Sequence, residues 1–221
     1  MILLASKSSG RLATLRAAGV EPLVRVSRVD EETVLGELIR RRRDAGLPAP
    51  SAAEQVQALA RAKALDVMTS TDPQEAEVVV GCDSMLEIAG QVVGKPADAA
   101  QARERWRMMS GGTGTLHTGH FLVRTADGTT AEGVSSATIR FGSPSPAEVE
   151  AYVASGEPLW CAGAFTIDGL GGAFIEEIDG DPHGVVGISL PLLRRLLAAL
   201  GVVWTDLWAP PPATKPVDDA H

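Results

Sequence analysis

The chain reads Val78-Val79-Val80-Gly81-Cys82-Asp83-Ser84 over residues 78–84, and this stretch indicates the fold class. Three consecutive β-branched residues predict a strand that is covered on both faces, as central strands of α/β proteins are. Asp83 would then lie just past the end of the strand, where such proteins place ligands and catalytic groups. We therefore expect an α/β fold with functional chemistry at Asp83. The alternative is that Asp83 is a turn residue or a helix cap.

Lysine is scarce in this sequence, and one lysine follows closely, in Gly94-Lys95-Pro96. Of the 20 basic residues, 16 are arginines and four are lysines, which are Lys7, Lys63, Lys95 and Lys215. A residue before proline is held extended, so the Lys95 side chain leaves the backbone in a defined direction. A compact ammonium at a chosen place suits phosphate oxygens. We therefore interpret Lys95 as a functional residue.

The composition predicts a globular domain. At 221 residues, 45% of them hydrophobic, the chain can form one domain with a full core. No apolar run is long enough to span a bilayer, and residues 1–6 look like a first strand rather than a signal peptide, so we expect a cytoplasmic protein. A net charge of −8 argues against general nucleic-acid binding. Cys82 and Cys161 lack the spacing of a zinc site or a disulfide framework.

Strand and helix patterns alternate along the chain. The periodicities predict strands over residues 2–5, 23–27, 115–124, 130–141 and 174–178, and a hairpin over 85–93 that turns at Ala89-Gly90. They predict helices over residues 8–18, 31–43, 52–68, 99–109 and 146–155. The buried face of a last helix is predicted to consist of Val186, Leu190, Leu193, Leu197 and Leu200. Residues 209–221 look like a disordered Pro-rich tail.

Two polar segments have both a functional and a structural interpretation. Ser6-Lys7-Ser8-Ser9-Gly10-Arg11 follows the first strand and opens a helix, which suits phosphate, with Arg11 as a bidentate clamp. The alternative is an ordinary serine N-cap, and from this segment alone we favour the N-cap. It is not a Walker A loop, because the only Gly-Lys pair is followed by Pro96. Asp30-Glu31-Glu32 could supply a second carboxylate or be a solvated helix start.

The remaining polar residues give weaker signals. Lys63 interrupts the apolar stripe of the helix predicted over residues 52–68, and a snorkelling side chain is its simplest explanation. The run Arg40 to Arg43 is typical of a solvated helix face. Three histidines, His117, His120 and His183, have no metal-ligand spacing with cysteines, and we interpret them as ordinary polar or surface residues. The glycine-rich loop over residues 163–172 could approach a ligand or build tight turns.

In combination, these segments resemble the Maf family of nucleoside triphosphate pyrophosphatases, in order and across nearly the whole chain. The matching segments are Leu4-Ala5-Ser6-Lys7-Ser8 with Arg11, Asp30-Glu31, Ala60-Arg61-Ala62-Lys63-Ala64, Gly81-Cys82-Asp83-Ser84, Gly94-Lys95-Pro96, Ser110-Gly111, Thr118-Gly119, Ala162-Gly163-Ala164-Phe165, Gly169-Leu170-Gly171-Gly172, Gly180-Asp181 and Val185-Val186-Gly187. No single segment is decisive, but their number and order make the resemblance specific.

The resemblance implies a fold and a reaction. The fold would be a Maf or inosine-triphosphatase-like mixed twisted sheet, flanked by helices, forming one catalytic domain over residues 1–208 with two lobes around a central cleft. The reaction would split a nucleoside triphosphate into a nucleoside monophosphate and pyrophosphate, with Mg²⁺ or Mn²⁺ as cofactor. Such an enzyme could remove non-standard nucleotides. The resemblance also allows a homodimer, and implies neither a nucleic-acid nor a membrane partner.

The resemblance also assigns roles by position. Asp83 would be the general base, with Glu31, Lys63 and Lys95 lining the cleft. The phosphate loop would contain Ser6, Ser8 and Arg11, and the other substrate-binding residues would be Ser84 and Asp168. Glu31 and Asp83 would bind the metal, and carboxylate oxygens suit Mg²⁺ or Mn²⁺. These roles fit phosphoryl chemistry, which needs positioning, cations and a base that orients water.

Three departures prevent the transfer of a substrate preference. The branch of the family that cleaves dTTP and UTP has two arginines at the positions that match 10 and 11, whereas this chain has Gly10 before Arg11. That branch has threonine where this chain has Ser84, and glutamine where it has Asp168. An alternative function also remains open, because family members are tied to inhibition of septum formation. The chain could then act mainly as a nucleotide-sensing binding protein, although Asp83, Lys63 and Lys95 favour an enzyme.

Overall fold

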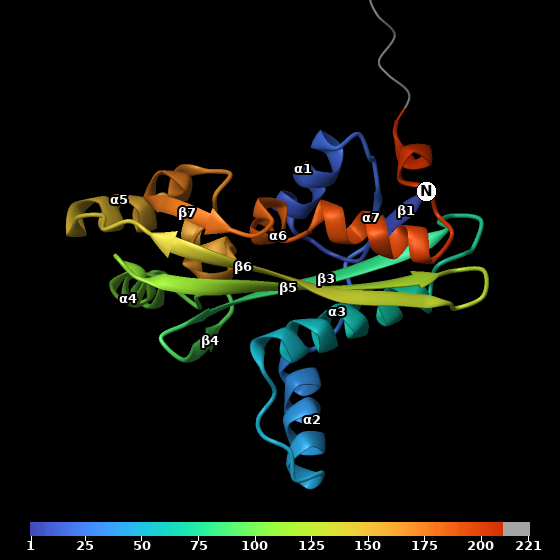
Figure 1. The fold of residues 1–221 in the computed structure, drawn as a ribbon, viewed down its shortest axis with the longest axis horizontal. Coiled ribbons are helices and arrows are strands. Elements are labelled where there is room, and N and C mark those ends of the chain that lie inside the picture. Colours follow the sequence, from blue (N-terminus) through green and yellow to red (C-terminus); the bar gives the residue numbers. More distant parts are fainter. Residues whose placement is uncertain (210–221) are drawn as a thin grey trace, which may run out of the picture.

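The computed structural model describes residues 1–209, which form a seven-stranded mixed sheet with helices on both faces (Figure 1). The strand order is β2-β1-β3-β5-β6-β7, with β4 paired to β3. The strands are β1 (Ile2–Leu4), β2 (Leu23–Val24), β3 (Val78–Ile88), β4 (Gln91–Val93), β5 (Thr113–Arg124), β6 (Thr130–Phe141) and β7 (Ile175–Asp179). β1 is parallel to both β2 and β3, and all other pairs are antiparallel. The expected α/β class with a mixed sheet is confirmed.

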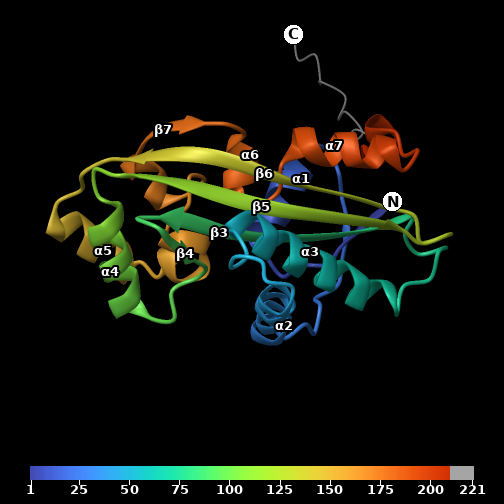
Figure 2. The same cartoon turned by 60° about the horizontal axis from the view of Figure 1, so that its bottom comes forward.

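The helices divide between the two faces of the sheet. Figure 1 and Figure 2 show α3 on one face, α1 and α7 on the other, and α4 with α5 at the end of the sheet away from the N-terminus. The α-helices are α1 (Ser9–Ala17), α2 (Glu31–Asp44), α3 (Ala52–Met68), α4 (Ala99–Met109), α5 (Pro146–Ala154), α6 (Pro182–Val186) and α7 (Leu190–Ala199). Four 3₁₀ segments are η1 (Glu157–Trp160), η2 (Ala162–Ala164), η3 (Leu170–Phe174) and η4 (Trp204–Leu207). None of these helices is both long and apolar enough to cross a bilayer.

The start of β3 is buried from both sides, as three successive β-branched residues predict. Val78 and Val80 pack in the core beneath α1 and α7, together with Leu4. Val79 points to the opposite face and packs with Ala64 of α3. All three valines are fully inaccessible to solvent.

The predicted end of this strand is wrong. β3 continues to Ile88, so Asp83 lies inside the strand and not past its end. The parallel pairing with β1 stops at Leu4 and Val80, whereas the antiparallel pairing with β5 continues to the end of β3. Asp83 therefore lies just beyond the parallel part of the sheet. There β3 is no longer paired with β1, and this edge of β3 borders a cleft.

Two glycines set the distance between α3 and the sheet. A Cβ at Gly81 would lie 2.9 Å from Ala64 Cβ and closer still to the carbonyl oxygen of Ala60. A Cβ at Gly119 would lie 2.5 Å from the carbonyl oxygen of Val56. Real Cβ atoms do not approach so closely, so the backbone of α3 rests directly on the bare backbone of β3 and β5.

Other boundaries differ in detail. The hairpin turns at Ala89-Gly90 as predicted, with positive φ at both residues. The strand expected over residues 23–27 has only two paired residues. Val186 does not belong to the last helix, because Gly187 (φ 126°) separates α6 from α7. The predicted tail lies outside the described residues except for Ala209, whose N–H donates to the Gly19 carbonyl.

Candidate active site

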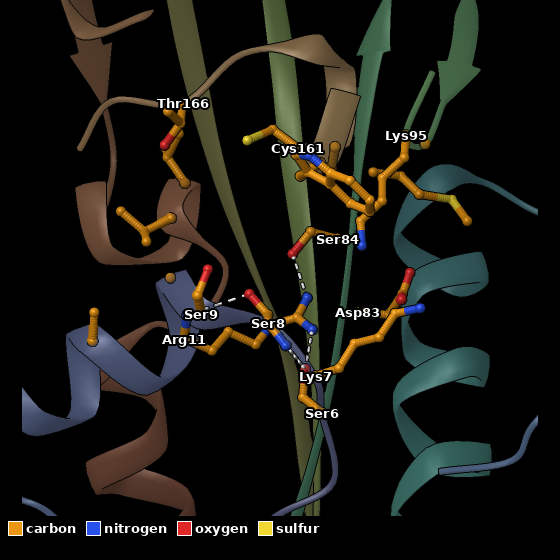
Figure 3. Close-up of a pocket in the computed structure, with 18 of the residues that line it drawn as sticks. Ser6, Lys7, Ser8, Ser9, Arg11, Asp83, Ser84, Lys95, Cys161 and Thr166 are labelled. Atoms are coloured by element: carbon orange, nitrogen blue, oxygen red, sulfur yellow. Dashed lines mark hydrogen bonds between the residues drawn. The ribbon is translucent and has the colours of Figure 1, made fainter. Parts of the chain in front are cut away.

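A cleft of about 960 Å³ opens beside the exposed edge of β3. Its walls come from the β1–α1 loop, the start of α2, the middle of α3, β3 and the segments from η1 to Gly169. Figure 3 shows the side chains that converge on it. Every site residue predicted from the sequence lines this cleft, namely Ser6, Ser8, Arg11, Glu31, Lys63, Asp83, Ser84, Lys95 and Asp168.

The β1–α1 loop is both a helix cap and a wall of the cleft. The hydroxyl of Ser8 caps α1 by accepting the N–H of Arg11, so the serine N-cap interpretation is confirmed. The hydroxyl of Ser6 accepts the N–H of Ser8 at 3.2 Å. Both serines also line the cleft. The first turn of α1 therefore presents hydroxyls and the positive end of a helix dipole to any anion bound there.

Arg11 is buried and connects three segments of the cleft. Its Nε donates to the carbonyl of Gly187 at 2.7 Å, one terminal nitrogen donates to Ser6 Oγ at 3.0 Å and the other to Ser84 Oγ at 3.1 Å. Three of the five guanidinium N–H groups are thus used within the described chain. Arg11 holds the cleft together, and a role as a bidentate phosphate clamp remains a prediction.

The bond from Arg11 to Ser84 continues as a chain of hydroxyls. Thr118 donates to the carbonyl of Gly184 at 2.8 Å, so its oxygen is free to accept from the Ser84 hydroxyl, also at 2.8 Å. Ser84 in turn accepts from Arg11. This network fixes the Ser84 hydroxyl on the face of β3 opposite to the Asp83 side chain, and it joins α1, β5 and α6.

Lys63 is the centre of the ionic part of the site. Its ammonium lies 2.6 Å from Asp83 Oδ1 and 2.7 Å from Glu31 Oε1, and its side chain is only 12% exposed. Glu31 is the first residue of α2, which Asp30 caps, so that helix start delivers the second carboxylate. The snorkelling interpretation of Lys63 is therefore wrong, because the ammonium turns inward to two acids and not outward to water.

Asp83 is largely buried. Burial raises the pKa of the Asp83 carboxyl above its usual range, against the opposing effect of the Lys63 and Arg11 cations. A carboxylate with a raised pKa is a better proton acceptor near neutral pH than an ordinary one. Burial also raises the pKa of the neighbouring Cys82 thiol to about 11, so Cys82 stays a neutral core residue and not a nucleophile.

The cleft concentrates lysine. Lys7 and Lys95 line it together with Lys63, so all the lysines in residues 1–209 face one cavity. Burial lowers the pKa of the Lys95 ammonium, and the nearby Arg11 and Lys7 lower it further. This crowding of like charges in an acidic protein indicates a polyanionic ligand. Sequence reasoning did not place Lys7 in the site, although the scarcity of lysine was the available signal.

Lys95 is positioned through its backbone. The buried Arg105 of α4 donates to the carbonyls of Gly94 and Lys95. The N–H of Gly163 also donates to the Gly94 carbonyl, at 2.9 Å. These bonds hold the Gly94-Lys95-Pro96 segment against η2, so the exit direction of Lys95 depends on distant residues as well as on the proline.

The expected divalent metal can be tested against the donors present. Glu31 and Asp83 supply carboxylate oxygens on both sides of the Lys63 ammonium, so the geometry already accommodates a positive charge between them. Mg²⁺ is commonly bound by one or two carboxylates plus substrate phosphates. No group of three or more His, Cys, Asp or Glu side chains that could hold a metal occurs in residues 1–209. The two acids therefore fit a metal whose remaining ligands are substrate and water oxygens.

Two of the positions that depart from the family pattern, Gly10 and Asp168, lie next to each other. A Cβ on Gly10 would lie 3.8 Å from Asp168 Oδ2 and 3.2 Å from Val186 Cγ1. Asp168 is exposed, lines the cleft and accepts a hydrogen bond from Thr166. The bare backbone at position 10 is thus packed closely against Val186 and lies beside an acid.

Among the histidines, the surface interpretation fails for His120. Its ring is completely buried, and Nε2 accepts the N–H of Ser189 at 2.9 Å. Burial lowers the pKa of His120 to about 4, so the ring stays neutral and acts as a structural acceptor. The Arg40 to Arg43 run is a largely solvated face, as predicted, with Arg42 bonded to the Pro48 carbonyl.

Comparisons with known proteins all point to one family. Residues 1–200 match the family described as Maf-like protein. A protein of Salinispora tropica is 50% identical over 97% of this chain and 90% of its own length. A protein of Streptomyces coelicolor is 50% identical over 95% of both chains, and one of Rhodococcus jostii is 51% identical over 93% of this chain and 95% of its own. All three are named nucleoside triphosphate pyrophosphatase. With a cleft that gathers the matching acids and lysines, and with this similarity over almost its whole length, the chain belongs to the Maf family.

Proposed function

We propose that this chain is a nucleoside triphosphate pyrophosphatase, an enzyme that hydrolyses a ribo- or deoxyribonucleoside triphosphate to the monophosphate and pyrophosphate. The observation that carries the proposal is the convergence of Lys7, Lys63 and Lys95 on a cleft whose deepest acid is Asp83. The names of relatives at about 50% identity support the same reaction. A cytoplasmic role in removing non-standard nucleotides belongs to this proposal.

The side chains divide the work of the reaction. Asp83 orients a water molecule toward the α-phosphorus and takes its proton, a step that its raised pKa favours. Lys63 and Lys95 stabilise the negative charge that develops on the phosphate oxygens and on the leaving pyrophosphate. Hydroxyls of Ser6 and Ser8, with the N-terminus of α1, orient the triphosphate.

A divalent cation completes this proposal. Glu31 and Asp83 would hold Mg²⁺ or Mn²⁺, which would neutralise phosphate charge and polarise the scissile bond. Lys63 lies between these acids, and in the presence of a cation there its ammonium would be available to a phosphate oxygen of the substrate.

Purified protein should release pyrophosphate and a nucleoside monophosphate from at least one triphosphate, and only when Mg²⁺ or Mn²⁺ is present. The reason is that the acids and lysines are set for attack at the α-phosphorus without a Walker A loop. The measurement is product identification by ion-exchange chromatography over a panel of standard and modified nucleotides. Orthophosphate and a diphosphate as products would refute the proposal. Tight nucleotide binding without any turnover would instead favour the nucleotide-sensing protein.

Asp168→Gln should shift the substrate preference from GTP toward UTP and dTTP. An ionised carboxylate only accepts hydrogen bonds, which suits the N1–H and N2–H₂ edge of guanine, whereas an amide also donates to uracil O2 or O4. We expect the ratio of kcat/KM values for GTP and UTP to fall about tenfold. Asp179→Asn, which neutralises an exposed acid on β7 away from the cleft, is the control. An unchanged order of preference would mean that Asp168 does not face the base.

A further inference from the structure

The cleft has one exposed aromatic face. Trp160, the last residue of η1, lines the cleft, and 77% of its surface is exposed. The other aromatic residue among those described as lining the cleft is Phe165, whose ring is buried and packs edge-on against Phe141. The indole of Trp160 is therefore the aromatic surface that a ligand in the cleft can reach.

The two ends of the cleft differ in their side chains. Lys7 and the hydroxyls of the β1–α1 loop lie at one end, and Figure 3 shows Lys95, Cys161 and Thr166 at the other, away from Ser6 and Lys7. Between Glu157 and Gly169 the residues that line the cleft include two acids and no lysine or arginine. A triphosphate that binds the β1–α1 loop, with Lys7 and the N-terminus of α1, leaves the base of the same nucleotide to extend toward Trp160. Asp168 lines the same cleft beside Gly10 of α1.

The backbone that carries Trp160 is fixed although its side chain is exposed. The carboxylate of Glu157 accepts the N–H groups of Leu170 at 3.0 Å and Gly171 at 2.9 Å. The thiol of Cys161 donates to the Glu157 carbonyl at 3.5 Å. These bonds tie η1 to the glycine-rich loop on both sides of Trp160. A platform that is already ordered loses little entropy when a ligand stacks on it.

We propose that Trp160 stacks on the nucleobase of the bound nucleotide and that it, with Asp168, forms the base site of this enzyme. The inference rests on the proposed function, because it needs a nucleotide whose phosphates occupy the end of the cleft formed by Lys7 and the β1–α1 loop. Every base has a π face, so the indole contributes affinity to all of them, most to the larger purines. Asp168 then discriminates between bases at their hydrogen-bonding edge.

The test compares Trp160→Ala, Trp160→Phe and the control Leu170→Ala, which truncates a 61% exposed side chain of the same region that is absent from the cleft wall. We expect Trp160→Ala to raise KM for GTP about tenfold with little change in kcat, the pattern of lost binding. Trp160→Phe keeps an aromatic face, so its KM should stay near that of the parent. Inhibition by tripolyphosphate, which has no base, should be equal in all variants.

A second readout does not require turnover. Adding GMP to the parent should quench tryptophan fluorescence, and Trp160→Phe should remove that quenching. Of the other three tryptophans, Trp106 is buried, and Trp204 and Trp208 do not line the cleft. Quenching that persists in Trp160→Phe, or an unchanged KM in Trp160→Ala, would overturn the inference while leaving the pyrophosphatase intact. A dimer that dissociates in Trp160→Ala at unchanged KM would assign the indole to a second copy of the chain. Without pyrophosphate release in the parent, the proposed function fails, and the quenching alone decides whether Trp160 binds the base.

Discussion

Asp83→Asn should lower turnover by roughly a hundredfold or more, the loss expected when a general base is removed. Asparagine keeps the shape of the side chain but accepts no proton at neutral pH. The fold should survive, because Lys63 retains its ion pair with Glu31 at 2.7 Å and the change removes a carboxylate whose burial raises its pKa. Steady-state release of pyrophosphate, with thermal unfolding in parallel, measures both effects.

The control for this variant lies on the same strand. Glu87→Gln removes one negative charge from an exposed position of β3 that does not line the cleft, and its turnover should equal that of the parent. Nucleotide affinity, measured by equilibrium dialysis with a non-hydrolysable analogue, should change little in Asp83→Asn. Near-normal turnover in Asp83→Asn would remove this residue from the mechanism.

The pH profile of the parent gives a further check on Asp83. The carboxylate must be ionised to accept a proton, and burial raises its pKa. Activity should therefore decline on the acid side at a higher pH than an ordinary aspartate would give. The same limb should be missing from the residual activity of Asp83→Asn.

Lys63→Met should also lower turnover by roughly a hundredfold, because it removes a donor aimed at developing charge. Methionine keeps much of the apolar stem, so packing along α3 is preserved. Without the ammonium, Glu31 and Asp83 repel each other, and the acid limb of the pH profile should move to higher pH. Turnover as a function of pH measures both the loss and the shift.

Lys95→Met is the matched comparison for Lys63→Met. Lys95 makes no ion pair within residues 1–209 and is not among the charges that shift the Asp83 pKa. Its loss should weaken catalysis without moving the acid limb. If Lys63→Met were fully active and more stable than the parent, the ammonium would have no part in the reaction.

Much of the fold could be predicted because local patterns dominate it. The helix over residues 52–68 has both boundaries as predicted, since Ser51 and Glu54 form a capping box at its start and its buried residues recur at helical spacing from Val56 to Val67. The end of β3 could not be predicted in the same way. Its polar residues Asp83 and Ser84 find partners on α3, α1 and β5, and those partners are remote in sequence.

The prediction of the site residues depended more on the resemblance to a family than on local sequence patterns. Lys63 alone looked like a snorkelling residue, because nothing local shows that Glu31 and Asp83 meet its ammonium from two different elements. Trp160 gave no signal at all, since an isolated tryptophan in a loop is as compatible with burial as with exposure. Only the packing of η1 against the glycine-rich loop leaves it facing the cleft.

The contact of α3 with Gly81 and Gly119 has a consequence for how this active site can be rebuilt elsewhere. Because the backbone of α3 touches the backbone of the sheet, the distance from Lys63 to Asp83 depends on the absence of side chains at Gly81 and Gly119. It does not depend only on the residues around the ammonium. A grafted or redesigned cleft that copied the acids and lysines but placed alanine at these positions would lift the helix by the thickness of a methyl group. The chemical groups would all be present and would not meet, so the glycine pair belongs to any minimal template of this site.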